Sequence, residues 1–204
     1  MAKIKICGIT NLADAESSSA LRIEYLGFNF YSKSPRYVEP EIAKKIIANN
    51  RQGLFNVGIF VDENPERVNE LVQYCNLDLV QLHGSETPEY CDQIDCETIK
   101  AFQVKDDTIL SSIDKYRTDY ILLDAHHPEL KGGTGETFNW EIAQQVVAAG
   151  KKIFLSGGLN AENIAQALSK IKPFAVDICS GAERTPGRKD PDKLQKLADI
   201  VRSL

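Results

Sequence analysis

The chain has 204 residues, of which 43% are hydrophobic and 26% are charged, and its formal net charge is −5. This composition is that of an ordinary globular protein with enough apolar material for one large core or two small ones. An acidic balance without blocks of like charge disfavours nonspecific nucleic-acid binding. No apolar run approaches the roughly 18 residues of a membrane span, and no apolar secretion signal follows Met1. We therefore expect a cytoplasmic protein that binds neither membrane nor nucleic acid.

The sequence contains five cysteines: Cys7, Cys75, Cys91, Cys96 and Cys179. An odd number without a secretion signal predicts free thiols in a reducing compartment. Only Cys91 and Cys96 lie close together in the sequence, and no second pair completes a zinc pattern, so no metal site is expected. Cys75 and Cys179 are expected to be buried as small apolar side chains.

Short apolar segments alternate with helical segments along the whole chain. The expected strands are 3–7, 25–31, 56–61, 79–83, 98–102, 120–124, 152–156 and 175–178. The expected helices are 11–21, 40–49, one from Asn64 or Pro65, 86–93, 106–115, 139–149, one capped near Asn160, and 191–203. Strands that are almost continuously apolar are typical of a parallel sheet covered on both faces.

Eight strand–helix units of roughly 25 residues each fit a compact (βα)8 TIM barrel, an α/β fold. No linker rich in Pro, Gly or Ser divides the chain, so we expect one catalytic domain over residues 1–204. The alternative is an open doubly wound sheet, which usually has fewer units, and the nucleotide-binding glycine motifs of that fold are absent. The loop 125–138 is longer than most βα loops, and we expect it to move as a lid.

In such a barrel the carboxyl ends of all strands meet at one rim, where active sites lie. The polar residues that interrupt the apolar strands fall at these ends: Cys7, loop 31–36, His83, Asp124, Ser156, Gly157, Gly158, Asp177, Ser180 and Gly181.

The loops after the last two strands carry Gly157-Gly158 and Ser180-Gly181. Loops at these positions often bind phosphate through backbone N–H groups, and glycine lets the backbone approach closely. A tight βα turn would also explain glycines here. Because both loops contain glycine, we expect a phosphate site, which backbone dipoles can form in an acidic protein.

Asp124 ends an otherwise apolar strand, and no helix start follows at once that would need it as a cap. Desolvation at an apolar rim would raise the pKa of its carboxyl group, which suits a general acid. By alternation Asp124 shares its strand face with Tyr120 and Leu122, so Leu122 would lie beneath it in the barrel.

Cys7 shares its strand face with Lys5 by the same alternation. If that face lines the barrel, Lys5 is buried below the thiol and needs a partner, for which Asp177 on the neighbouring strand is the candidate. A nearby cation would favour the thiolate and give a base suited to neutral pH. A lone cysteine is more often an inert core residue.

Arg36 lies in a loop stiffened by Pro35, with Tyr31 and Tyr37 as possible aromatic walls. A guanidinium group can bind a carboxylate bidentately, so we expect Arg36 to bind a flat anionic ligand. His83 is expected to be a polar wall of the pocket.

Motifs in this order resemble phosphoribosylanthranilate isomerases of tryptophan biosynthesis across essentially the whole chain. They are Lys5-Ile-Cys-Gly-Ile-Thr10, Gly27-Phe-x-Phe-Tyr-x-x-Ser-Pro-Arg-Tyr37, Val80-Gln-Leu-His-Gly84, Leu123-Asp124, Gly132-Gly-Thr-Gly135, Ser156-Gly-Gly-Leu-Asn160 and Val176-Asp-x-x-Ser-Gly181.

The resemblance implies an Amadori rearrangement of N-(5-phosphoribosyl)anthranilate by general acid–base catalysis, without cofactor or metal. It implies Cys7 as the base, Asp124 as the acid and Arg36 as the group that meets the anthranilate carboxylate. The glycine loops would bind the phosphate, and His83 and Asp177 are further expected substrate contacts. Cys179 departs from the family pattern, in which serine is expected.

Two alternative functions remain open. Another phosphate-binding barrel enzyme, an epimerase or an aldolase, would need metal-ligating histidines or a Schiff-base lysine, for which Lys100 is the lysine to check. A non-catalytic sugar-phosphate binding protein would keep the glycine loops and could dispense with Cys7 and Asp124. The sequence leaves open whether the chain is a monomer or a homodimer.

Overall fold

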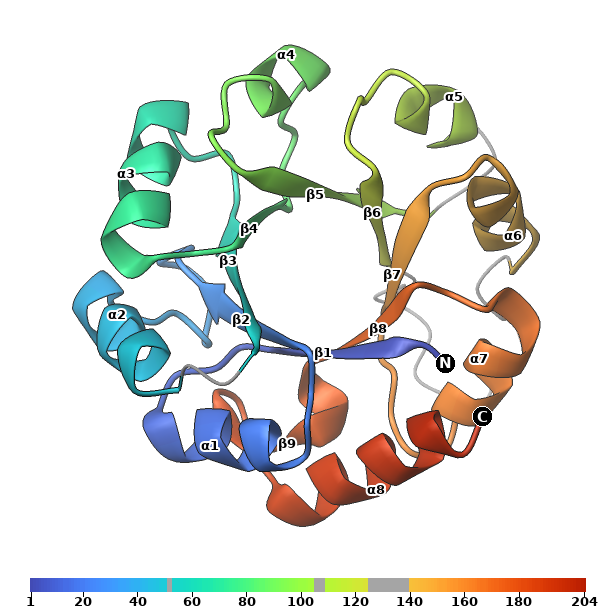
Figure 1. The fold of residues 1–204 in the computed structure, drawn as a ribbon. Helices are drawn as coiled ribbons and strands as arrows, with labels where there is room; N and C mark the ends of the chain where they lie inside the picture. The colour runs from blue at the N-terminus through green and yellow to red at the C-terminus, as the bar shows by residue number, and fades with distance from the viewer. Residues whose placement is uncertain (51–52, 105–108, 125–139) are drawn as a thin grey trace.

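A computed structural model describes residues 1–50, 53–104, 109–124 and 140–204. Within these residues, eight parallel strands pair in chain order and close into a barrel, with the helices arranged around the outside (Figure 1). The strands are β1 (Lys3–Cys7), β2 (Tyr25–Asn29), β3 (Phe55–Phe60), β4 (Leu79–Leu82), β5 (Glu97–Gln103), β6 (Tyr120–Asp124), β7 (Lys152–Ser156) and β8 (Ala175–Ile178). The predicted TIM barrel is confirmed, and the closed sheet excludes the doubly wound alternative.

The helices follow the strands at the expected places. They are α1 (Leu12–Ala20), α2 (Pro40–Asn49), α3 (Pro65–Cys75), α4 (Pro88–Cys91), α5 (Ile109–Ile113), α6 (Trp140–Ala148), α7 (Ile164–Ile171) and α8 (Pro191–Arg202). Asn11 caps α1 by accepting a hydrogen bond from the backbone N–H of Asp14, which satisfies a donor that the first turn leaves unpaired.

Helix α7 begins later than the sequence suggested. Asn160 accepts a hydrogen bond from the backbone N–H of Glu162 and so forms a turn of its own. Asn163 then stands at the N-cap position, and the helix starts at Ile164. An asparagine favours turns and caps alike, so the sequence could not separate the two positions.

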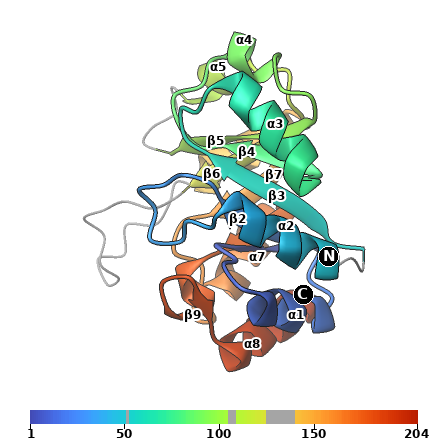
Figure 2. The ribbon, with the colours of Figure 1, turned by 90° about the vertical axis from the view of Figure 1, so that its left-hand side faces the viewer.

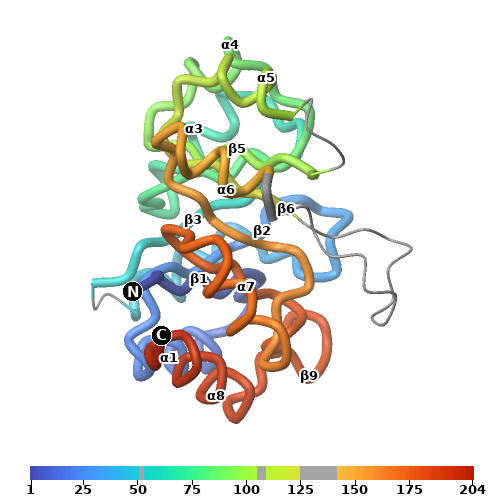
Figure 3. Tube along the Cα trace, turned by 90° about the vertical axis from the view of Figure 1, so that its right-hand side faces the viewer, coloured from blue at the N-terminus to red at the C-terminus, as the bar shows by residue number. Residues whose placement is uncertain are grey.

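A short segment that the sequence did not predict lies between β8 and α8. It contains a single 3₁₀ turn, η1 (Ser180–Ala182), and an antiparallel pair, β9 (Glu183–Thr185) and β10 (Arg188–Lys189). Figures 2 and 3 show β9 and the loop after β2 at the same end of the barrel, opposite the N-terminus. This hairpin therefore borders the carboxyl-end mouth of the barrel.

The barrel interior is filled by one apolar cluster, separate from the larger core between strands and helices. Its fully buried members are Tyr25, Val57, Leu79, Ile99, Ala101, Leu122, Phe154 and Ala175. Because side chains alternate along a strand, residues two or four positions beyond these members face the mouth. His83, Asp124, Ser156, Asp177 and Cys179 all stand in that relation.

Candidate active site

Cys7 reaches the mouth at the end of β1. Lys5 is paired in register with Tyr25, a member of the inner cluster, and Cys7 is paired with Gly27. A Cβ added to Gly27 would lie 3.2 Å from the Cys7 sulfur, so the glycine leaves room for the thiol. The half-buried Cys7 thus points inward above Lys5, as alternation predicted.

The predicted pairing of Lys5 with Asp177 is confirmed. The Lys5 Nζ donates to Asp177 Oδ1 at 2.9 Å, and the two side chains are 0% and 4% exposed. Burial opposes the charge on Lys5, yet attraction to Asp177 and to Cys7 raises the pKa of Lys5 above its ordinary value. A permanent cation therefore lies directly below Cys7.

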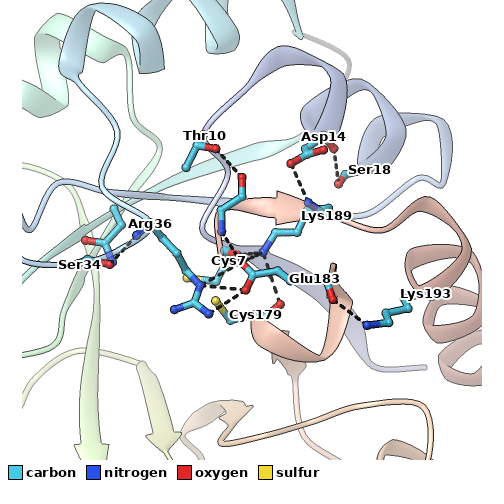
Figure 4. Close-up of polar contacts among 12 residues, drawn as sticks. Cys7, Thr10, Asp14, Ser18, Ser34, Arg36, Cys179, Glu183, Lys189 and Lys193 are labelled. Carbon is cyan, nitrogen blue, oxygen red and sulfur yellow. Dashed lines mark hydrogen bonds and ion pairs between the residues drawn. The ribbon is translucent and has the colours of Figure 1, made fainter. Parts of the chain in front are cut away.

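Cys179 is not the buried apolar side chain that the sequence suggested. It is half-buried at the mouth beside Cys7, because β1 and β8 are neighbouring parallel strands (Figure 4). A hydrogen bond from the Cys179 thiol is the main cause that lowers the pKa of Cys7 to about 6, against burial and with help from Lys5 and Lys189. The same contact raises the pKa of Cys179, which stays protonated. All five cysteines are free, as expected.

The lowered pKa of Cys7 predicts how kcat/KM depends on pH. If Cys7 is the base, kcat/KM falls about tenfold per pH unit below about 6, since only the thiolate accepts a proton. Replacing Cys179 by alanine removes the main stabiliser of the thiolate, so this acidic limb moves to higher pH. The measurement is the pH profile of kcat/KM. Cys75 is a buried cysteine at the end of α3, and Cys75→Ala is the control that leaves the limb in place. A Cys179→Ala profile equal to that of wild type contradicts the assignment.

Asp124 faces the mouth from β6, two residues beyond the inner Leu122, as predicted. Its Oδ2 lies 3.6 Å from His83 Nε2, and the two side chains are 20% and 31% exposed. The His83 ring is fixed from below, because Gln81 Nε2 lies 2.8 Å from His83 Nδ1. The contact with Gln81 orients the ring so that Nε2 faces Asp124. The raised pKa expected for Asp124 stays a prediction.

Arg36 already holds a carboxylate within the protein, contrary to the simple picture of a free clamp. Its Nε donates to Glu183 Oε1 at 2.9 Å and its Nη2 to Glu183 Oε2 at 2.7 Å. The loop before it is set by Ser34, whose Oγ accepts from the backbone N–H of Arg36. Glu183 carries no signal that the sequence could have revealed, since it lies just beyond the short turn η1.

The two glycine loops meet at the mouth. Gly157 and Gly158 have positive φ angles of 103° and 70°, a region that favours glycine. A Cβ on Gly181 would lie 1.9 Å from the carbonyl oxygen of Leu159, so the loop after β8 rests directly on the loop after β7. Gly158 and Ser180 are exposed. The structure therefore joins the predicted phosphate-binding loops into one accessible surface.

Replacing Gly181 by alanine tests this contact. The methyl group cannot fit against Leu159, so the loops must separate, at a cost of about 1–3 kcal/mol of stability. We expect KM for the phosphorylated substrate to rise about tenfold, since the backbone donors then diverge. Gly53→Ala meets no atom within 4 Å but is strained by the positive φ of 73° at that position, so it controls for a loss of stability that leaves these two loops in place. An unchanged KM in Gly181→Ala contradicts a phosphate site here.

Two other predictions concern the tyrosines beside Arg36 and the lysine on β5. Tyr31 and Tyr37 line a cavity of about 300 Å³ together with Arg67 of α3, and Arg36 is not among its lining residues. The expectation that the two tyrosines flank a ligand at Arg36 stays a prediction. Lys100 is 2% exposed and pairs with Glu86 at 3.0 Å, while its Nζ also donates to backbone oxygens. It is no candidate for a Schiff base.

The expected lid, the motif 132–135 and the histidines at 126 and 127 lie outside the described residues. Among the residues that are described, no group of three or more His, Cys, Asp or Glu could hold a metal ion. Nor does any helix in the described ranges have the length and apolar character needed to cross a membrane.

The fold and its mouth define a (βα)8-barrel enzyme. The sequence model of the N-(5′-phosphoribosyl)anthranilate isomerase family matches residues 4–200. The curated N-(5′-phosphoribosyl)anthranilate isomerase of Trichlorobacter lovleyi is 47% identical over 197 residues, covering 97% of this chain and 96% of that protein.

Comparison with solved structures points to the same family. The phosphoribosylanthranilate isomerase of Thermotoga maritima is 40% identical, covers 100% of both chains and has a TM-score of 0.92. A second structure of such an isomerase, in complex with reduced 1-(o-carboxyphenylamino)-1-deoxyribulose 5-phosphate, is 38% identical over 100% of both chains, with a TM-score of 0.89. The chain belongs to the N-(5′-phosphoribosyl)anthranilate isomerase family. It is an isomerase of tryptophan biosynthesis, which confirms the resemblance seen in its motifs.

Proposed function

We propose that this mouth converts N-(5-phosphoribosyl)anthranilate into 1-(2-carboxyphenylamino)-1-deoxyribulose 5-phosphate by an Amadori rearrangement. The observation that carries the proposal is the pair of proton-transfer groups facing the same mouth. Cys7 ends β1 and Asp124 ends β6, on strands separated by β7 and β8 in the closed ring (Figure 1). An acid and a base set apart in this way can act on different atoms of one substrate.

The proposed reaction needs one proton delivered and one removed. Asp124 gives its proton to the ring oxygen of the ribose, so the C1′–O bond breaks and a Schiff base forms. Cys7, as thiolate, takes the proton from C2′, and the electron pair of that bond moves to give an enolamine. The enolamine becomes the ketone product when its 2′-hydroxyl group loses a proton and C1′ gains one. The Cys7 thiol gives up its proton and the Asp124 carboxylate takes one up, so both groups return to their starting states. The cysteine acts as a base and forms no covalent bond to the substrate.

The remaining contacts divide between the two ends of the substrate. Gly157, Gly158, Ser180 and Gly181 are proposed to hold the phosphate through their backbone N–H groups. Arg36 is proposed to meet the anthranilate carboxylate through the part of its guanidinium that Glu183 leaves open. The compound in the complex of the solved relative, reduced 1-(o-carboxyphenylamino)-1-deoxyribulose 5-phosphate, carries both a carboxylate and a phosphate, which supports a ligand with these two ends.

His83 and Asp177 are proposed to line the substrate between its two charged ends. His83 presents its Nε2 edge to Asp124. One carboxyl oxygen of Asp177 accepts a hydrogen bond from Lys5. Asp177 stands two positions beyond Ala175 of the apolar cluster and His83 stands four positions beyond Leu79, and the sugar hydroxyl groups would sit beside them.

The test is turnover of purified protein, followed as loss of substrate fluorescence. We expect isomerisation that saturates with substrate and that inorganic phosphate inhibits. Absence of turnover together with binding of a phosphorylated sugar analogue would favour the binding-protein reading and overturn this proposal.

We further propose that residues 1–204 form one catalytic domain that works in the cytoplasm as a monomer or a homodimer. Light scattering of the active protein distinguishes the two oligomeric states.

A further inference from the structure

A buried network of three charged side chains lies beside Cys7 (Figure 4). Glu183 accepts from Arg36 on both carboxylate oxygens, and Lys189 Nζ donates to Glu183 Oε1 at 2.9 Å. Glu183 is 6% and Lys189 is 1% exposed. Burial opposes ionisation of Glu183, but the hydrogen bonds from Arg36 and Lys189 hold its pKa below the ordinary range. The carboxylate is therefore charged and fully engaged.

Lys189 ties this network to the strand that carries the proposed base. Its Nζ also donates to the backbone oxygen of Cys7 at 2.5 Å and lies 3.4 Å from the backbone oxygen of Cys179. One ammonium group thus joins the carboxyl ends of β1 and β8 to Glu183. The backbone N–H of Lys189 donates to Asp14 Oδ2, which holds the lysine from the side of α1.

The Arg36 side chain packs against Gly8, the residue that follows Cys7. A Cβ on Gly8 would lie 2.7 Å from Arg36 Cδ, so any larger residue would push the arginine away. The side chain of Arg36 is 22% exposed, whereas the side chain of Glu183 is 4% exposed. The arginine is therefore the member of the network that can meet a ligand.

A guanidinium group offers two edges that can each bind a carboxylate bidentately. Glu183 takes the edge formed by Nε and Nη2. The edge formed by Nη1 and Nη2 is left for a second carboxylate, and its direction is set by Glu183. An arginine held in this way loses less conformational freedom when a ligand binds.

We propose that Glu183, anchored by Lys189, is a positioning residue that orients Arg36 toward the carboxylate of the substrate. The inference rests on the proposed role of Arg36. The hairpin after β8 then takes part in substrate selection, because it supplies both Glu183 and Lys189.

The test compares two substrates, N-(5-phosphoribosyl)anthranilate and the analogue made from aniline, which lacks the carboxylate. The ratio of their kcat/KM values measures selection for the carboxylate and does not depend on how much protein is folded. The variants are Arg36→Met, Glu183→Gln and the double variant. Glu183→Gln keeps the shape of the side chain and removes its charge.

We expect Glu183→Gln to lower the ratio about tenfold, mainly through KM for the carboxylated substrate. Arg36→Met lowers the ratio further, and Glu183→Gln then has no additional effect in the double variant, because Glu183 acts only through Arg36. Lys189→Met lowers the ratio as well, and Lys189→Arg restores part of it. Glu70→Gln, which breaks the exposed pair of Arg67 and Glu70, is the matched control and leaves the ratio unchanged.

The positioning role of Glu183 and the carboxylate-binding role of Arg36 are tested by different outcomes. If Arg36→Met lowers the ratio and Glu183→Gln does not, the positioning role of Glu183 is overturned. The same holds if the effects of the two variants simply multiply, which would show that Glu183 acts independently of Arg36. If Arg36→Met itself leaves the ratio unchanged, the proposed carboxylate clamp is wrong, and with it the basis of this inference.

Discussion

Replacing Cys7 by serine is expected to lower kcat by about a thousandfold, within the range that a general base contributes. A serine hydroxyl has nearly the same shape, so the change removes the proposed base and keeps the packing beside Gly27. The pKa of the Cys7 thiol is lowered to about 6, which favours the thiolate at neutral pH. A hydroxyl group in the same place remains protonated. The measurement is kcat at saturating substrate, so that any change in binding is excluded.

The control for Cys7→Ser is Cys91→Ser, a half-buried cysteine on α4 that lies away from the mouth. It should turn over like wild type. A Cys7→Ser protein with the kcat of wild type would show that another group removes the C2′ proton. A Cys7→Ser protein that still binds the product confirms that the loss is chemical.

The sequence could predict the barrel and the direction in which side chains at the strand ends point, because both depend on local patterns. Alternation along a single strand places Cys7 above Lys5 and Asp124 above Leu122. Parallel pairing in chain order then brings all strand ends to one mouth. The Lys5–Asp177 pair followed from these two rules together, because a buried lysine requires a partner and β8 is the neighbour of β1.

The contacts that tune the site could not be predicted, because they depend on short segments without periodicity. Glu183 and Lys189 belong to strands of three and two residues. The contact of Glu183 with Arg36 spans 147 positions of the chain. Cys179 was misjudged for a related reason. Its neighbours suggest an apolar strand, yet it stands one position past the end of β8, where the side chain faces the mouth.

The charges at the mouth now account for the balance between acid and base. Two buried cations, Lys5 and Lys189, lie on the side of β1, where they favour the thiolate of Cys7. Asp124 lies on another part of the ring, beside His83 Nε2. Because the cations are paired with Asp177 and Glu183, their charges are held in place and are only partly cancelled. The barrel thus keeps the proposed acid and the proposed base in separate electrostatic surroundings.

Replacing Asp124 by asparagine is expected to lower kcat by about 10²- to 10⁴-fold, since the amide cannot deliver a proton to the ring oxygen. The step affected is ring opening, which precedes removal of the C2′ proton. With a substrate analogue that is already in the open-chain form, Asp124→Asn should therefore lower kcat much less. This difference separates an acid from a residue that merely shapes the pocket, because a loss of shape would slow both substrates alike.

Asp119→Asn is the matched control, since Asp119 is an exposed residue just before β6, at the opposite end of the same strand. It should keep the kcat of wild type. His83→Ala tests the neighbour of Asp124, and we expect a smaller loss than for Asp124→Asn, because His83 stabilises the carboxylate that remains after the proton has left. If His83→Ala slows the natural substrate as much as Asp124→Asn does and spares the open-chain substrate, while Asp124→Asn slows both substrates alike, the histidine is the acid and the role proposed for Asp124 is wrong.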